Sequence, residues 1–169
     1  MNTLVANFLR IAAAGLLIVT LSGCAENPVT GRQNLVLMSA NEEIRAGREA
    51  DAEIRKEYGV YNNAALQQYV DRVGQRVART SHRGDLTYRF TVLDSPEINA
   101  FALPGGYVYV TRGMLAYLNT ESELAAVLGH EIGHVTARHA VQQQSAATAA
   151  NLGIMLGSIF LPELRSQAA

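Results

Sequence analysis

The segment that most limits how this chain can fold is LGHEIGH, residues 128–134. The preceding residues 120–123, TESE, match a capping box, which predicts that a helix begins there and carries the segment. On a helix of 3.6 residues per turn, His130 and His134 differ in direction by only about 40°. The opposite side of this helix is apolar and consists of Leu124, Leu128, Ile132 and Val135. The helix is therefore expected to bury one side in a core and to line a cleft with the other.

Two histidines at this spacing can reach one cation, and Glu131 lies about 100° from His130 and about 60° from His134. From there its carboxylate can contact a metal-bound water without binding the metal. The HExxH pattern provides these groups for zinc: two neutral nitrogen ligands and a general base. The competing interpretation is two ordinary helix histidines beside a chance glutamate. The capping box and the uncharged residues Ile132 and Gly133 within the motif disfavour it.

The residues around the motif add three further expectations. Continued on the same helix, His139 lies about 180° from His130, on the apolar side, so we expect a structural histidine satisfied by a hydrogen bond rather than a third ligand. His82, in the loop TSHRGD, is expected to be a solvated surface residue. The small residues on the histidine side leave room for a backbone or substrate to approach; they are Ala126, Gly133 and Ala137.

The N-terminus has the features of an export signal. A single positive charge precedes the apolar block IAAAGLLIVT, which is too short to span a membrane. The block leads through Leu21-Ser22-Gly23 into Cys24, the only cysteine of the chain. This pattern resembles the lipobox of bacterial lipoproteins and implies a signal peptide at 1–23, acylation of Cys24 and attachment to a membrane. Ala25, after the cysteine, implies sorting to the outer membrane. A buried thiol is the alternative for Cys24.

The remaining sequence predicts an α+β domain that follows a tether at residues 24–38. Helical spacing and capping signals predict helices over 39–58 and 63–79, and a short helix over 111–119. Alternation predicts a strand over 86–94, and the runs 98–104 and 107–111 around Gly105-Gly106 predict a hairpin. The apolar run from residue 147 to Pro162 is shorter than a membrane span. A core or partner-facing helix is favoured there over membrane contact.

Charge does not indicate a nucleic-acid partner. The net charge is −1, from 14 basic and 15 acidic residues that are scattered along the chain. Since no basic run stands out, we do not expect this protein to bind nucleic acid.

Two motifs in this order resemble a known family. SPEINAFALPGGYVYVTRGML followed by ESELAAVLGHEIGHVTARHA is similar to the zinc endopeptidases of metallopeptidase family 48, and NPVTGRQNLVLMS resembles the exported bacterial branch. The resemblance implies a zincin-like α+β fold, with helices packed on a small mixed or antiparallel sheet. It implies that His130 and His134 bind one Zn²⁺ and that Glu131 is the general base. It also implies a strand beside the cleft, to which an extended substrate can add, at Asn99, Ala100, Phe101 and Ala102.

The function implied is that of a lipid-anchored zinc endopeptidase in the bacterial cell envelope. It would lie at the periplasmic face of the outer membrane and cleave misfolded or unassembled envelope proteins, with envelope assembly proteins as candidate partners. The alternative function is a catalytically silent lipoprotein that binds partners or acts like a chaperone.

The third zinc ligand is where this sequence departs from the family. The family takes it from a glutamate several dozen residues after the second histidine, whereas 35 residues follow His134 here. Glu163 is the sole carboxylate among them, and its context LPELR does not match. We therefore expect residues 39–169 to be a metallopeptidase domain that lacks its C-terminal part, in a fragment or truncated product. Weak metal binding and little or no activity are the corresponding expectations.

Overall fold

The computed structural model describes residues 24–27, 31–84 and 86–160 of the 169-residue chain. The predicted signal peptide at 1–23 and the carboxylate of Glu163 lie outside the described residues. In chain order the elements are β1 (Cys24–Glu26), β2 (Gln33–Leu35), α2 (Ala40–Tyr58), α3 (Ala64–Ala78), β3 (Arg89–Leu93), β4 (Ala100–Leu103), β5 (Tyr107–Thr111), α4 (Arg112–Tyr117), α5 (Glu121–Thr136) and α6 (His139–Phe160).

The main sheet has three strands in the order β3-β5-β4. β3 and β5 run parallel, whereas β4 and β5 form an antiparallel hairpin in which Leu103 pairs with Tyr107. Gly105 and Gly106, with φ of 77° and 93°, make the turn. The sheet is therefore mixed, and the hairpin predicted from Gly105-Gly106 is confirmed. No described strand pairs with the other side of β4, which leaves β4 at the edge.

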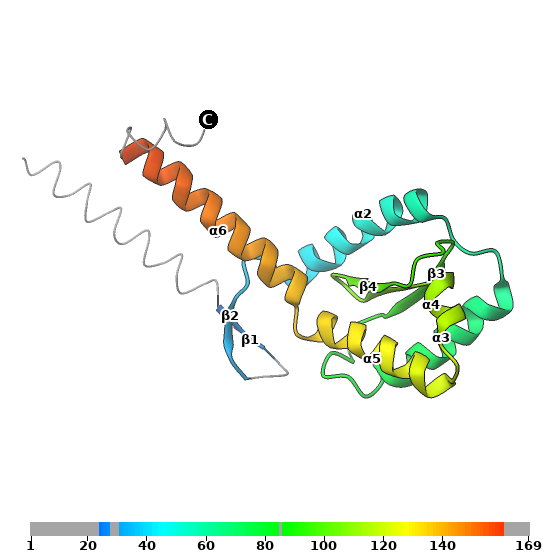
Figure 1. Ribbon diagram of the computed structural model, residues 1–169. Helices are drawn as coiled ribbons and strands as arrows, with labels where there is room; N and C mark the ends of the chain where they lie inside the picture. The colour runs from blue at the N-terminus through cyan, green and yellow to red at the C-terminus, as the bar shows by residue number, and fades with distance from the viewer. Residues whose placement is uncertain (1–23, 28–30, 85, 161–169) are drawn as a thin grey trace, which may run out of the picture.

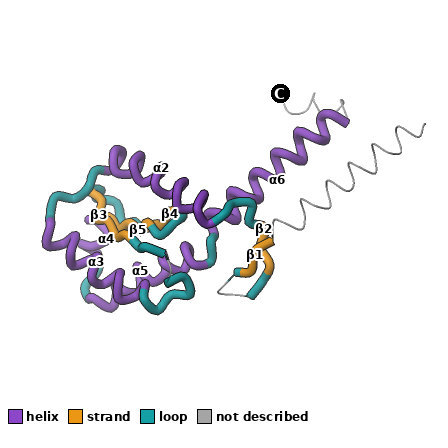
Figure 2. The backbone as a smooth tube through the Cα atoms, turned by 180° about the vertical axis from the view of Figure 1, so that it is seen from behind, coloured by secondary structure: helices purple, strands orange, loops and turns teal. Residues whose placement is uncertain are grey.

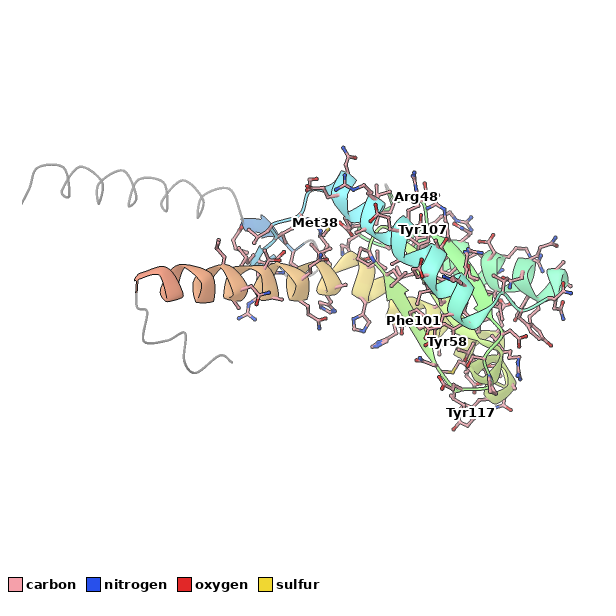
Figure 3. The ribbon with its side chains drawn as sticks, turned by 90° about the horizontal axis from the view of Figure 1, so that it is seen from above. Met38, Arg48, Tyr58, Phe101, Tyr107 and Tyr117 are labelled. Carbon is pink, nitrogen blue, oxygen red and sulfur yellow. The ribbon has the colours of Figure 1, made fainter. Side chains whose placement is uncertain are left out.

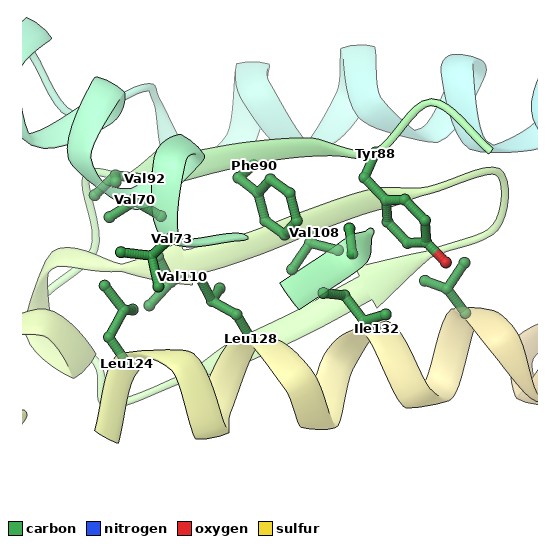
Figure 4. Packing of buried hydrophobic residues seen from close by; sticks show 12 residues of the cluster. Val70, Val73, Tyr88, Phe90, Val92, Val108, Val110, Leu124, Leu128 and Ile132 are labelled. Atoms are coloured by element: carbon green, nitrogen blue, oxygen red, sulfur yellow. The ribbon is translucent and has the colours of Figure 1, made fainter. Parts of the chain in front are cut away.

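Helices cover both faces of this sheet (Figure 1), with α2 on one face and α3 and α5 on the other. In β5, Val108 and Val110 belong to the core shared with α3 and α5. The alternate residues Tyr107 and Tyr109 pack with side chains of α2. Figure 4 shows Leu124, Leu128 and Ile132 of α5 extending from the helix toward the strands in the first of these cores. β5 is thus buried on both faces, as a central strand between two helical layers must be.

Local sequence signals explain where the helices begin. Ser39 with Glu42, and Thr120 with Glu123, form complete capping boxes at the starts of α2 and α5. Asn63 caps α3 through its side chain, which accepts a hydrogen bond from the Leu66 N–H. These predicted helix starts are confirmed to within a residue or two.

The N-terminal segment folds back onto the last helix. β1 and β2 pair antiparallel, with Cys24 opposite Leu35, within the residues expected to be a tether. The Leu37 N–H then donates to Ser145 Oγ of α6 at 3.0 Å. Figures 1 and 2 show this hairpin beside α6, which projects away from the main body. The hairpin and the start of α6 are therefore held together by polar contacts.

The projecting part of α6 does not belong to the core. Val141 and Ser145 are buried near its start, but the side chains of residues 146–153 are exposed or half-buried. Among the described helices, none combines the length and apolar character that a membrane crossing requires. The prediction of a partner-facing helix is still untested for this segment.

Candidate metal centre

α5 separates a core face from a cleft face, as its sequence predicts. The four apolar residues expected on the back side are all buried; they are Leu124, Leu128, Ile132 and Val135. His130 and His134 lie on the other side and are exposed. Because the helix is fixed to the sheet through its apolar side, the direction of both imidazoles is set by the core.

The two histidines present nitrogen atoms to one point. The Nε2 atoms of His130 and His134 are 3.1 Å apart, and the rings meet edge to face at 82°. Two nitrogens bound tetrahedrally to zinc at about 2.0–2.1 Å are separated by roughly 3.3 Å. The spacing in this structure therefore fits a shared zinc ion with little adjustment of either side chain.

Glu131 lies between the histidines in sequence but in a different environment. Only 8% of its surface is exposed. Burial raises the pKa of its carboxyl, while the positive charge that His134 and His130 can carry acts in the opposite direction. A carboxylate with a raised pKa is a stronger base, which suits proton abstraction from water.

A cleft of about 240 Å³ adjoins the motif. It is lined by Glu131 and His134 from α5 and by Phe101 and Ala102 from the edge strand β4, among others. On the far side of β4, the ring of Phe101 stacks on Tyr109 with centroids 4.9 Å apart and lies near Tyr58 of α2 (Figure 3). These aromatic contacts hold the strand in place beside the cleft.

The predicted substrate strand corresponds closely to β4. Ala100, Phe101 and Ala102 are strand residues at the free edge, whereas Asn99 precedes the strand. The Asn99 carbonyl accepts hydrogen bonds from the backbone N–H and the hydroxyl of Thr111, so it points back into the fold. The expectations for His82 and for the small residue Gly133 also agree with the structure, since both are exposed.

The expectation for His139 is wrong in its placement. α5 ends at Thr136, and Arg138 adopts a positive φ of 57°, so the chain changes direction before His139 begins α6. His139 is exposed rather than on the apolar side, and its Nδ1 lies 2.8 Å from Nδ1 of His134. The expected hydrogen bond exists, but its partner is one of the two candidate ligands. Ala137, expected on the open side, is buried by the same turn.

Sequence reasoning missed a charged cluster in the wall of the cleft. Glu43 of α2 is 1% exposed, and its carboxylate lies 2.8 Å from Arg83 and 3.0 Å from Arg138. Arg138 Nη2 also donates to the Met38 carbonyl at 3.0 Å. In sequence, Glu43 looks like an ordinary acidic residue in the first turn of a helix, and its partners lie 40 and 95 positions away. No local signal identifies this cluster.

The described residues bring two candidate ligands together rather than three. Within this part of the chain, no three histidine, cysteine or acidic side chains are grouped so that they would hold one metal ion. The third donor is therefore not assigned.

Comparison with known proteins adds an independent line of support. The sequence model of peptidase family M48 matches residues 64–168. The chain is 31% identical to a putative beta-barrel assembly-enhancing protease of Vibrio cholerae over 156 residues, which cover 90% of this chain and 32% of that protein. It is 34% identical to the mitochondrial metalloendopeptidase OMA1 of Schizosaccharomyces pombe over 139 residues, 79% of this chain and 41% of that protein.

A third similar protein is the beta-barrel assembly-enhancing protease of Escherichia coli, which is 33% identical over 135 residues, 78% of this chain and 28% of that protein. The chain thus spans between about a quarter and two fifths of the length of these curated relatives.

Proposed function

The chain belongs to peptidase family M48, and we propose that it acts as a zinc-dependent endopeptidase through α5 and the cleft beside it. One observation carries the proposal: two Nε2 atoms 3.1 Å apart lie next to a buried carboxylate, and the same cleft is bordered by β4, whose outer edge pairs with none of the described strands. A metal, a base and a site for an extended peptide are the three parts that hydrolysis of a peptide bond requires.

Each residue of the motif has a separate role in this proposal. His130 and His134 would hold the zinc through Nε2. When bound, zinc supplies an acidic water and a positive charge that stabilises the oxyanion of the peptide carbonyl. Glu131 would take the proton of the attacking water and return it to the leaving nitrogen. Its burial raises the pKa of its carboxyl, which makes its carboxylate a stronger base.

The edge strand would orient the substrate. An extended peptide added to β4 gains backbone hydrogen bonds that do not depend on its side chains. The backbone at Ala100–Leu103 is paired on one side by β5, and none of the described strands pairs with the other side. This recognition suits a peptidase that accepts many sequences provided that the segment is extended and unfolded.

The proposed substrates are misfolded or unassembled proteins of the bacterial envelope. The names of the Vibrio cholerae and Escherichia coli relatives, which refer to beta-barrel assembly, support this proposal. The lipobox-like sequence at Cys24 supports a lipid anchor at the periplasmic face of the outer membrane. Envelope assembly proteins would then be neighbours and candidate partners.

A silent lipoprotein that binds envelope partners is the second candidate. The observation that favours it is the donor set, since a catalytic zinc takes three protein ligands and the described residues group only two. Zinc on two histidines alone would be bound weakly, and the cleft would then serve only to hold an extended segment.

The deciding experiment is casein cleavage by the chain in the presence of excess zinc, with wild type compared with Glu131→Gln. Zinc content is measured on both proteins. We expect slow, zinc-dependent cleavage that Glu131→Gln lowers by about 10²–10⁴-fold while its zinc content is unchanged.

A wild-type chain that holds zinc stoichiometrically but shows no Glu131-dependent cleavage would contradict the proposal and favour the binding protein. Fast cleavage with stoichiometric zinc would support peptidase activity but contradict the expected weak binding. In that case Glu163 or a donor from a second copy becomes the candidate third ligand, and Glu163→Gln separates the two.

A further inference from the structure

We propose that His139 is a positioning residue of the metal centre, which accepts the Nδ1–H of His134 and so directs the lone pair of His134 Nε2 to the metal. The inference rests on the proposed function, because it assumes that His134 is a ligand. It concerns a residue outside the HExxH motif, on a different helix. From the sequence alone, this residue is expected on the apolar side of the motif helix.

The geometry is a row of three imidazoles. Nδ1 of His139 lies 2.8 Å from Nδ1 of His134, and Nε2 of His134 lies 3.1 Å from Nε2 of His130. The rings of His134 and His139 are tilted by 72° with centroids 4.9 Å apart, so the contact is made through the ring edges rather than by stacking. His134 therefore uses both of its nitrogens, one on each neighbour.

A neutral imidazole carries one proton, so the central ring donates at one nitrogen and accepts at the other. If His139 donated to His134 Nδ1, the proton of neutral His134 would lie on Nε2, and that nitrogen would have no lone pair for a metal. If His134 donates from Nδ1 to His139, the lone pair of Nε2 is free. Only the second arrangement leaves Nε2 of His134 ready to bind a metal. In the metal-free chain this nitrogen accepts the Nε2–H of His130, so His130 would have to move its proton to Nδ1 before its own Nε2 could bind the metal.

The position of His139 does not depend on the histidines themselves. Arg138, in the left-handed conformation, turns the chain between α5 and α6, and its side chain is held by Glu43 and by the Met38 carbonyl. The Asn27 side chain donates to the Ala137 carbonyl at 3.4 Å in the same turn. Contacts from α2 and the N-terminal segment thus place His139 beside His134.

An acceptor on the outer nitrogen of a ligating histidine has a known effect. It fixes the tautomer and the ring orientation and raises the basicity of the ligand, and its loss typically costs 10–100-fold in metal affinity. His139 supplies such an acceptor through the lone pair of a ring nitrogen.

The first test reads the tautomer directly and needs no metal. Long-range ¹H–¹⁵N correlation spectra of the metal-free protein, with ¹⁵N-labelled histidine, distinguish Nδ1–H from Nε2–H. We expect His134 to carry its proton on Nδ1 and His139 to carry its own on Nε2. A proton on Nε2 of His134 would overturn the inference.

The second test compares zinc affinities, measured by competition with a chelating dye. His139→Ala is expected to bind zinc about 10–100-fold more weakly than wild type. His139→Asn places an amide oxygen near the position of Nδ1 and is expected to stay within a few-fold of wild type. His82→Ala, which removes an exposed histidine outside the motif, is the matched control and should bind as wild type does.

Two results of this comparison would overturn the inference. One is His139→Ala with wild-type affinity. The other is His139→Asn binding as weakly as His139→Ala, which would assign the ring a packing role only. Circular dichroism of the metal-free variants checks that both fold. A wild-type chain that binds no zinc would contradict the proposed function instead. The tautomer spectrum would then still test the hydrogen bond from His134 to His139.

Discussion

Glu43 is a buried carboxylate whose charge is balanced by two arginines from distant parts of the chain. Its side chain is 1% exposed, against 11% for Arg83 and 17% for Arg138. Removal of one partner from a buried ion pair leaves the others uncompensated and typically costs 3–5 kcal/mol. We predict that Glu43→Gln lowers the free energy of unfolding by about 3 kcal/mol, measured by urea denaturation.

The control for this change is Glu49→Gln, on the exposed side of the same helix. It should change the free energy of unfolding by less than about 0.5 kcal/mol. Equal effects of the two substitutions would show that the cluster around Glu43 does not stabilise the fold.

Tyr109 gives the stability a pH dependence at the alkaline end. Its side chain is 1% exposed, and its hydroxyl donates to Asp51 Oδ1 at 2.6 Å. Burial and this carboxylate raise the pKa of Tyr109 above its ordinary value. In the unfolded chain tyrosine ionises near pH 10, so above about pH 10 the unfolded state binds fewer protons and stability falls as pH rises.

The predicted contribution of Tyr109 is a loss of at most about 1.4 kcal/mol per pH unit above pH 10. Urea denaturation of wild type and Tyr109→Phe at pH 9, 10 and 11 measures it. Tyr109→Phe is expected to lose stability less steeply, although other tyrosines leave a residual slope. If the free energy of unfolding falls equally steeply with pH in wild type and in Tyr109→Phe, the result would argue against a buried, un-ionised Tyr109.

At the scale of single residues, the sequence identified the motif but not everything that contacts it. His130, Glu131 and His134 follow from spacing on one helix, and the structure places them as the spacing requires. His139 did not follow, because the prediction continued the helix through Arg138. A positive φ at a residue other than glycine has no reliable sequence signal.

At the scale of elements, α2 packs tightly against the β4–β5 turn. A Cβ on Gly47 would overlap the carbonyl oxygen of Pro104. We predict that Gly47→Ala forces α2 away from the sheet and lowers the free energy of unfolding by about 1–3 kcal/mol. Thermal denaturation followed by circular dichroism measures the change.

Gly153→Ala is the matched substitution for comparison. Gly153 is also helical, but nothing lies within 4 Å of a Cβ built on it. It should therefore be neutral or stabilise by up to about 1 kcal/mol, since alanine is the better helix former. A stabilising Gly47→Ala would mean that α2 does not approach the turn as closely as the structure shows.

The main elements were predictable because their signals are local. Capping boxes fixed the starts of α2 and α5, alternating residues indicated β3, and Gly105-Gly106 indicated the hairpin. The β1–β2 hairpin and its contact with α6 were not predicted. The contact with α6 joins Leu37 to Ser145, 108 positions away. A pair so far apart in the sequence leaves no periodic pattern.

At the scale of the whole molecule, we propose that acylation of Cys24 determines where the protein is located. Cys24 begins β1, whose hairpin lies beside α6. We predict that Cys24→Ala abolishes labelling by a radioactive or clickable fatty acid and releases the protein from the membrane fraction. Glu131→Gln serves as the control and should stay labelled and membrane-bound. Acyl labelling that survives Cys24→Ala would refute the lipoprotein assignment.

The zinc site is the central claim, and anomalous diffraction at the zinc edge tests it most directly. Crystals of the chain grown with zinc should show one strong peak within bonding distance, about 2.0–2.1 Å, of Nε2 of both His130 and His134. The same map would reveal the third donor. A peak bound to other residues, or to only one of the two histidines, would contradict the account.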